Sequence, residues 1–172
     1  MSVSINVVPL CKHLGSIIDG TGSLIPEARN RTKAAMNSYA PLAVCLLGSK
    51  HVSQNKRVQL NWSLVMSRLT YNVHTWSTFN GQHRNILNLM YMRTWRRVAG
   101  DPRFGKTFWS DYEIRVRLGV PSLDCLIRKR RLVYLSRLAA AEFDALHAAL
   151  QAKGNTGNRM PWTVLLINDL VI

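Results

Sequence analysis

The sequence predicts a mainly α-helical protein that begins with a short β-hairpin. After Pro26, apolar residues recur at three- and four-residue steps, which is the period of one helix face. Before Gly20, in contrast, apolar Val3, Ile5 and Val7 alternate with polar residues, as they do along a strand. Hydrophobic residues make up 47% of the 172-residue chain, which is enough to bury a core.

The hairpin is expected within residues 1–22. The stretch from Lys12 to Asp19 is predicted as its second strand, and Gly20-Thr21-Gly22 as the turn that ends it. Two short strands are not stable alone in water. They must therefore pack against the helices that follow or against a surface outside this chain.

Residues 23–100 are predicted to form a three-helix bundle. The first helix begins near Pro26, is kinked by Pro41 and ends by Gly48. The second begins at Ser53, a favourable N-cap, and continues to about Trp76. Its buried face is predicted to carry Val58, Trp62, Val65, Leu69, Val73 and Trp76. The third helix, about 82–98, is predicted to bury Leu87, Met90, Tyr91, Trp95 and Val98.

Residues 101–172 are predicted to form a second helical layer, with the loop 101–105 as the boundary. Ser110 and Glu113 have the spacing of a capping box, ahead of a short helix that ends at Gly119. A turn at Val120-Pro121 then leads into a long helix, about 122–151. The apolar end of the chain, 161–172, is predicted as a last short helix.

The chain carries a large positive charge. It has 23 basic and 9 acidic residues, a net charge of +14 and a pI near 10.6. Such a balance attracts polyanions, so RNA or DNA is the expected partner. An anionic membrane surface, or a basic surface with no polyanionic partner, are the weaker interpretations. No membrane partner is expected, because nucleic acid is the stronger interpretation of the charge, and no span is expected, because apolar runs such as 42–47 are far shorter than the roughly 20 residues that cross a bilayer.

Cysteine usage bears on the compartment. The three cysteines, Cys11, Cys45 and Cys125, are widely separated and do not have the spacing of a disulfide framework. Scattered free cysteines fit a reducing compartment. We therefore expect the protein in the nucleus or the cytoplasm.

Several short sequence segments, taken in their order along the chain, resemble segments of one protein family. They are Lys12-His13-Leu14-Gly15-Ser16-Ile17, Ile25-Pro26-Glu27, Leu69-Thr70-Tyr71, Arg93 to Arg97, and Leu118-Gly119-Val120-Pro121-Ser122. The order resembles the thumb and post-thumb region of LINE-type (non-LTR) retrotransposon reverse transcriptases. The resemblance implies a thumb-like bundle that grips a primer–template duplex, with His13, Leu14 and Gly15 in a primer-grip-like position. It also implies that the catalytic Asp-Asp turn belongs upstream of Lys12, in a separate catalytic palm.

The acidic residues do not have the pattern that polymerase chemistry requires. Two-metal catalysis needs carboxylates that converge on two ions about 4 Å apart, and the sequence contains no Asp-Asp pair. Cys11 and His13 begin a zinc-like spacing, but no second ligand pair follows them. No Walker-type phosphate loop is present either. We therefore expect no enzyme activity, no catalytic residues, no metal, no cofactor and no small-molecule substrate.

Clusters of basic residues carry the remaining functional signal. We predict that nucleic acid is bound by Lys12, Arg29, Lys33, Lys56, Arg57, Arg93, Arg96, Arg97, Arg128, Lys129 and Arg131, with Lys50 in the cluster around Lys56. The alternative without a functional role is that these clusters form a solvated surface with extended side chains. Arg130 lies on the apolar stripe of its helix, so it either extends to solvent or is held by a buried acceptor.

Two other functions remain open. The short helix, the turn at Val120-Pro121 and the basic helix after it are similar to a helix-turn-helix DNA-binding module. The chain is otherwise a structural or interaction protein, or a relic without a selected function. The apolar tail segment 164–167 fits a piece that has lost a partner surface.

The absence of paired aspartates generates a first prediction. The purified chain is expected to show no primer extension and no nuclease activity with Mg²⁺ or Mn²⁺, because no carboxylate pair is present to hold the metal ions. The measurement is extension and cleavage of a labelled primer–template. Activity that exceeds a mock purification would contradict the prediction.

Overall fold

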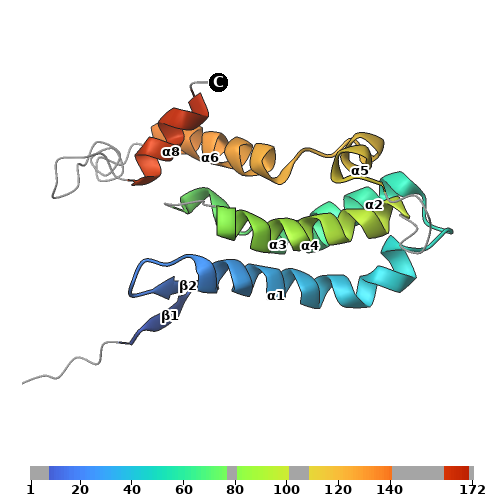
Figure 1. The fold of residues 1–172 in the computed structure, drawn as a ribbon, viewed down its shortest axis with the longest axis horizontal. Helices are drawn as coiled ribbons and strands as arrows, with labels where there is room; N and C mark the ends of the chain where they lie inside the picture. Colours follow the sequence, from blue (N-terminus) through green and yellow to red (C-terminus); the bar gives the residue numbers. More distant parts are fainter. Residues whose placement is uncertain (1–7, 77–80, 101–108, 141–160, 171–172) are drawn as a thin grey trace, which may run out of the picture.

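The structure is a computed structural model that describes residues 8–76, 81–100, 109–140 and 161–170. It is mainly α-helical, with a two-stranded antiparallel hairpin ahead of the helices, which confirms the predicted fold class. The described helices are arranged in three layers, with the hairpin at one end of the lowest layer (Figure 1).

The hairpin has a different register from the one predicted. Strand β1 (Leu10–His13) pairs with β2 (Ser16–Asp19), so the stretch from Lys12 to Asp19 is not one strand. The chain reverses at Leu14 and Gly15, which both have positive φ, 47° and 85°. Two such residues form the tight turn that matches the twist of paired strands. The alternating residues 3–7, predicted as the first strand, lie outside the described part of the chain.

Polar contacts with the first helix hold this hairpin. The backbone N–H of Ile17 donates to the Glu27 carboxylate at 2.6 Å. Glu27 also forms a buried ion pair with Arg31, with 2.9 Å between Oε1 and Nε. The carbonyl of Gly15 accepts hydrogen bonds from Asn30 (3.2 Å) and from Arg31. The strands therefore depend on the first helix, as their length requires.

The first helix, α1, runs from Ile25 to Leu42 and continues as a π-helical segment, Ala43–Leu47. Pro41 lies one residue before the end of α1 and has no N–H to donate to the preceding turn. The hydrogen-bond pattern widens after this proline, and the chain bends away from the axis of α1 (Figure 1). The predicted effect of Pro41 is confirmed.

The predicted second helix is broken into shorter pieces. It comprises α2 (Gln54–Leu60), a π-helical segment (Asn61–Met66), α3 (Ser67–Leu69) and a 3₁₀ turn (Val73–Thr75). The prediction of one helix through Trp76 was wrong, because the helical run ends at Leu69 and Asn72 then adopts a left-handed conformation (φ 57°) that separates it from the 3₁₀ turn. Ser53 occupies the N-cap position, but its hydroxyl makes no capping hydrogen bond.

The predicted apolar face survives these breaks. Val65, Leu69, Val73 and Trp76 are buried, and the half-buried Val58 and Trp62 pack against the same core. The breaks change the backbone pattern without turning these side chains outward.

Helix α4 (Gly81–Ala99) lies at the centre of the protein. It contacts α1, α2, α5 and α6, and all five residues predicted to face inward are buried. Polar residues are buried on it too: Thr94 Oγ1 accepts a hydrogen bond from Asn61 Nδ2 at 3.1 Å. A helix that is covered on several sides needs such internal partners for its polar groups.

The upper layer contains α5 (Asp111–Leu118), α6 (Leu123–Ala139) and α8 (Pro161–Leu170). The predicted capping box at Ser110 and Glu113 is present, and Gly119 ends α5 with φ 64°. The predicted continuation of the long helix to residue 151 lies outside the described residues. One hydrophobic core extends from Ala28 on α1 to Ile127 on α6, so it includes residues from both sides of the boundary predicted at 101–105.

The turn residue Leu14 generates a second prediction. A left-handed conformation is costly for leucine, and this side chain is 79% exposed, so it gains little burial in return. Leu14→Asn is expected to stabilise the protein by about 0.5–1 kcal/mol, because asparagine tolerates this conformation. The free energy of unfolding in urea measures the change. Leu14→Ala, which keeps the backbone penalty, is the control, and equal stability of the two variants would contradict the explanation.

Candidate nucleic-acid interface

A cavity of about 840 Å³ lies where the C-terminal part of α1 and its π-helical segment meet the C-terminal part of α4. Among the described residues that line it, five carry a positive charge and none carries a carboxylate. We call this cavity the basic pocket. Its charged residues are Lys50, Arg57, Arg93, Arg96 and Arg97.

Arg97 is fixed by a contact with the backbone of another segment. Its Nε donates to the carbonyl of Ala43 at 2.7 Å, at the start of the π-helical segment. Gly48 makes room for it, because a Cβ atom at this position would lie 2.6 Å from Arg97 Cζ. No side chain larger than hydrogen fits there without displacing the guanidinium group.

Arg57 and Arg93 are oriented by weaker contacts. Arg57 Nη1 donates to the carbonyl of Leu47 at 3.4 Å. The guanidinium of Arg93 lies 5.9 Å from the ring centroid of Tyr39, within the range of a cation–π interaction. Arg93 and Lys50 are both exposed. A guanidinium has five N–H donors, so each arginine keeps donors for an anion after making the contact described.

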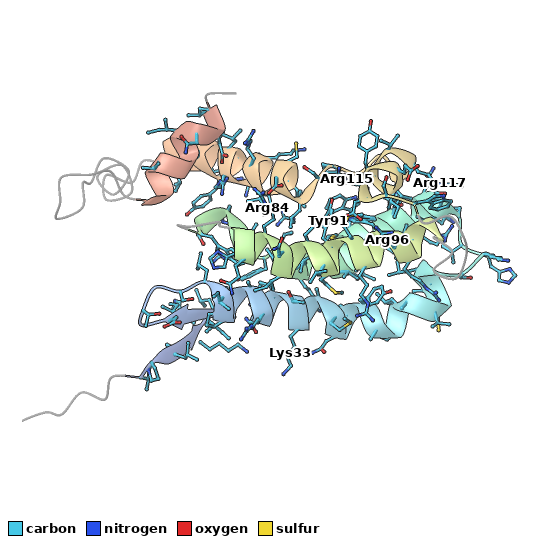
Figure 2. All side chains as sticks on the ribbon, viewed as in Figure 1. Lys33, Arg84, Tyr91, Arg96, Arg115 and Arg117 are labelled. Carbon is cyan, nitrogen blue, oxygen red and sulfur yellow. The ribbon has the colours of Figure 1, made fainter. Side chains whose placement is uncertain are left out.

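Arg96 has a mainly structural role. It donates to the carbonyl of Trp109 at 2.9 Å and forms an ion pair with Asp111, the first residue of α5. Figure 2 shows Arg96 on α4 next to the layer that contains α5. This residue therefore joins the middle and upper layers, and the Asp111 carboxylate offsets part of its charge.

The other residues of the N-terminal half of the chain that were predicted to bind nucleic acid lie on the surface. Arg29 and Lys33 share the outer face of α1, and both are exposed. Figure 2 shows Lys33 extending from α1 away from the other helices. Lys12 on β1 and Lys56 on α2 are exposed as well. The structure does not bring these four residues into the basic pocket.

The cluster at 128–131 is divided between internal contacts and solvent. Arg131 is 7% exposed and binds the Asp169 carboxylate with two hydrogen bonds, 2.6 and 3.0 Å. Arg128 binds the same carboxylate at 3.2 Å. These two predicted nucleic-acid ligands instead attach α8 to α6, so we exclude them from the proposed interface. Lys129 is exposed, and Arg130 donates to the buried carbonyl of Thr70 at 2.8 Å, which decides its role.

The predicted primer-grip-like residues, His13, Leu14 and Gly15, are together at the tip of the hairpin, and all three are exposed. The carbonyl of Leu14 accepts a hydrogen bond from the Tyr71 hydroxyl at 3.2 Å. The guanidinium of Arg31 lies over the Tyr71 ring, 4.9 Å from its centroid. The tip is therefore supported from below while its side chains face solvent.

Sequence reasoning missed three residues that shape these surfaces. Gly48 was interpreted only as the end of a helix, and neither Tyr39 nor Asp169 was predicted to contact an arginine. An acidic residue in an otherwise apolar segment of a basic protein was the available signal for Asp169, because a carboxylate there needs a cationic partner. No comparable signal marks Gly48, whose neighbour Arg97 is distant in sequence.

One phenol inside the structure is strongly perturbed. Burial raises the pKa of Tyr91 to about 12. Its hydroxyl donates to the carbonyl of Pro121 at 2.6 Å. The neutral phenol therefore acts as a fixed contact between α4 and the turn before α6, and it does not take part in proton transfer near neutral pH.

Within the described ranges, no group of three His, Cys, Asp or Glu residues is arranged to hold a metal ion. In the same ranges, no helix is long and apolar enough to cross a bilayer. Comparisons of the chain with protein-family models, with curated proteins and with solved structures find no match.

The Asp169 contacts generate a third prediction. Asp169→Ala is expected to destabilise the protein by about 3 kcal/mol, because it leaves the buried Arg131 guanidinium without its partner. Asp124→Ala is the matched control, since Asp124 pairs with Arg84 at 2.9 Å but both side chains are about half exposed. Its cost should stay below about 1 kcal/mol. Equal losses in thermal unfolding of the two variants would contradict the structural role of Asp169.

Proposed function

We propose that this protein is a non-catalytic module that binds an RNA or DNA duplex through its phosphate backbone. The basic pocket carries the proposal: five cationic side chains from three segments of the chain line one cavity, and no carboxylate is among its described lining residues. Like charges repel one another unless counter-charges are close. A bound polyanion would supply these counter-charges.

The arrangement favours phosphates over bases. Arginines fixed by carbonyl contacts, such as Arg97 and Arg57, present their remaining donors in a defined direction. Such contacts position a nucleic acid but carry no sequence information. The module is therefore expected to bind unrelated sequences with similar affinity. The resemblance to LINE-type reverse transcriptases adds a specific form of the proposal, a thumb-like grip on a primer–template duplex beside a separate catalytic palm.

The outer face of α1 extends the proposed surface. Arg29 and Lys33 are exposed at consecutive turns of one helix face, where they can follow a backbone. Lys12, Lys56 and Lys129 are exposed and contribute to the general field of the +14 charge. The hairpin tip at 13–15 remains the position for a strand end in the thumb-like form of the proposal.

The helix-turn-helix alternative has the helical order it needs in α5 and α6. A recognition helix uses the exposed residues of its first turns to contact bases. At the start of α6 these include Asp124, paired with Arg84, and Arg128, paired with Asp169. A carboxylate at this position repels phosphates, so the backbone-binding module has the stronger support.

The proposal generates a prediction on salt dependence. If about five phosphates are neutralised, log affinity should fall against log salt concentration with a slope near −4 to −5. Replacing Lys50 and Arg93 with Gln should flatten the slope by about two, one for each lost phosphate contact. Binding of two unrelated duplexes is measured between about 50 and 200 mM salt. A preference for one duplex would favour the helix-turn-helix alternative.

Two further variants separate the pocket from total charge. A double change of Arg68 and Arg84 to Gln removes the same charge outside the basic pocket and should leave the slope near the unmodified value. Gly48→Ala keeps the charge but displaces Arg97, so it should flatten the slope by about one. Thermal unfolding of each variant checks its folding. Equal slopes for both double variants, or no binding at low salt, would overturn the proposal.

A further inference from the structure

A second cavity, of about 350 Å³, lies between the 3₁₀ turn Val73–Thr75 and α6. Its lining combines cationic groups with two aromatic rings and an apolar wall, and it shares no residue with the basic pocket. We call it the His74 pocket. Its described lining residues are His74, Leu126, Lys129, Arg130, Val133, Tyr134 and Arg137.

Positive charge is concentrated in this pocket. The groups that face His74 from α6 are Lys129, Arg130, Arg137 and the Tyr134 phenol, and the segment Val73–Thr75 adds no other ionisable group. Burial, and then the charges of Arg130 and Arg137, lower the pKa of His74. Burial also lowers the pKa of Arg130. No carboxylate is among the described lining residues.

The pocket is also prearranged. Arg130 is fixed by its hydrogen bond to the carbonyl of Thr70. The rings of His74 and Tyr134 are in contact, with centroids 4.5 Å apart and planes inclined at 49°. Two described carboxylates lie on or against α6: Asp169 is bound by Arg128 and Arg131, and Asp124 is paired with Arg84. Groups that are already ordered lose little entropy when an anion binds.

We propose that the His74 pocket binds a phosphate dianion and that binding is coupled to protonation of His74. The cavity volume is within the range of small-ligand sites. Arg130, Arg137 and Lys129 supply charge-assisted donors for phosphate oxygens. The dianion has two possible sources, free phosphate or the terminal phosphate of a nucleic-acid strand. The inference does not rest on the proposed function, because this cavity shares no described lining residue with the basic pocket.

The direction of the coupling follows from the charges. His74 has a lowered pKa, so it is neutral at pH 7 in the free protein. A bound dianion offsets the charges of Arg130 and Arg137 and favours the imidazolium, so it raises the pKa of His74. Because linkage is reciprocal, affinity for the dianion should increase as pH falls from about 8 toward the second pKa of a phosphate monoester, near 6.

The test is an NMR pH titration of the histidine ring protons in the full chain, with and without inorganic phosphate at constant ionic strength. Spectra of His74→Gln assign the His74 signals. The pKa of His74 is expected to rise with phosphate. His83 is the internal reference, because burial alone lowers its pKa. Equal shifts of the two histidines, or no shift of His74, would overturn the proposal.

A pair of hairpin oligonucleotides, one with a 5′-phosphate and one with a 5′-hydroxyl, distinguishes the sources. If the ligand is a strand end, the phosphorylated hairpin raises the pKa of His74 at much lower concentration than inorganic phosphate does. If the ligand is free phosphate, the two hairpins have the same effect on His74. Both results support a phosphate site, and they assign its source.

Charge-matched variants test the residues. Arg137→Gln, at an exposed position on α6, is expected to weaken phosphate binding roughly fivefold to tenfold. Arg117→Gln removes the same charge from an exposed position on α5, outside the described lining of both pockets, and should leave affinity unchanged. Equal losses in the two variants would show that phosphate responds only to net charge, and this would overturn the proposal.

Discussion

The structure depends on how a chain with few carboxylates accommodates many arginines. Of the nine acidic residues, Asp101, Glu142 and Asp144 lie outside the described ranges. Among the other six, four form ion pairs with arginine: Glu27, Asp111, Asp124 and Asp169. Asp19 accepts hydrogen bonds in the turn after β2, and Glu113 completes the capping box of α5. The ion pairs of Asp111, Asp124 and Asp169 each join two separate helices.

Several other arginines use backbone carbonyls in place of carboxylates. Arg97 binds Ala43, Arg57 binds Leu47, and Arg130 binds Thr70. These carbonyls lie within or just after helical segments, where the normal hydrogen-bond pattern is interrupted. A guanidinium satisfies such an oxygen but leaves its own positive charge without a counter-charge. The basic pocket and the His74 pocket are both found where this solution is used.

Local features of the fold were predictable because their causes are local. The apolar period located α1 and α4, and the capping box and Gly119 located the two ends of α5. The hairpin register was not predictable. The turn places a leucine in a conformation that leucine disfavours, and distant residues such as Arg31 and Tyr71 bind its carbonyls. Tertiary contacts outweigh local propensity at this turn.

The sequence predicted which basic residues cluster, but it did not predict the contacts that each of them makes in the structure. Sequence clusters identified Arg93, Arg96 and Arg97 together, and the structure gives each a different environment: Tyr39, Asp111 and Ala43. Arg128 and Arg131 are close in sequence to Lys129 and Arg130, yet they face the opposite element, α8. A helix directs neighbouring residues to different sides, so a run of basic residues cannot by itself define a surface. Partners as distant in sequence as Asp169 decide which charges remain available.

The difference between arginines paired with carboxylates and arginines bound to backbone carbonyls explains why the two pockets are suited to anions. The charge of an arginine that is held by a carboxylate is neutralised. An exposed lysine is surrounded by water, and its side chain loses conformational entropy when it binds an anion. An arginine held by a carbonyl is fixed in place and still charged. It therefore combines the two properties that strengthen an anion contact, prearranged donors and an uncompensated charge. Considering only contacts between described residues, Arg97 in the basic pocket and Arg130 in the His74 pocket both have this combination. The scarcity of carboxylates that constrains folding thus also produces the two pockets that we propose as phosphate-binding sites.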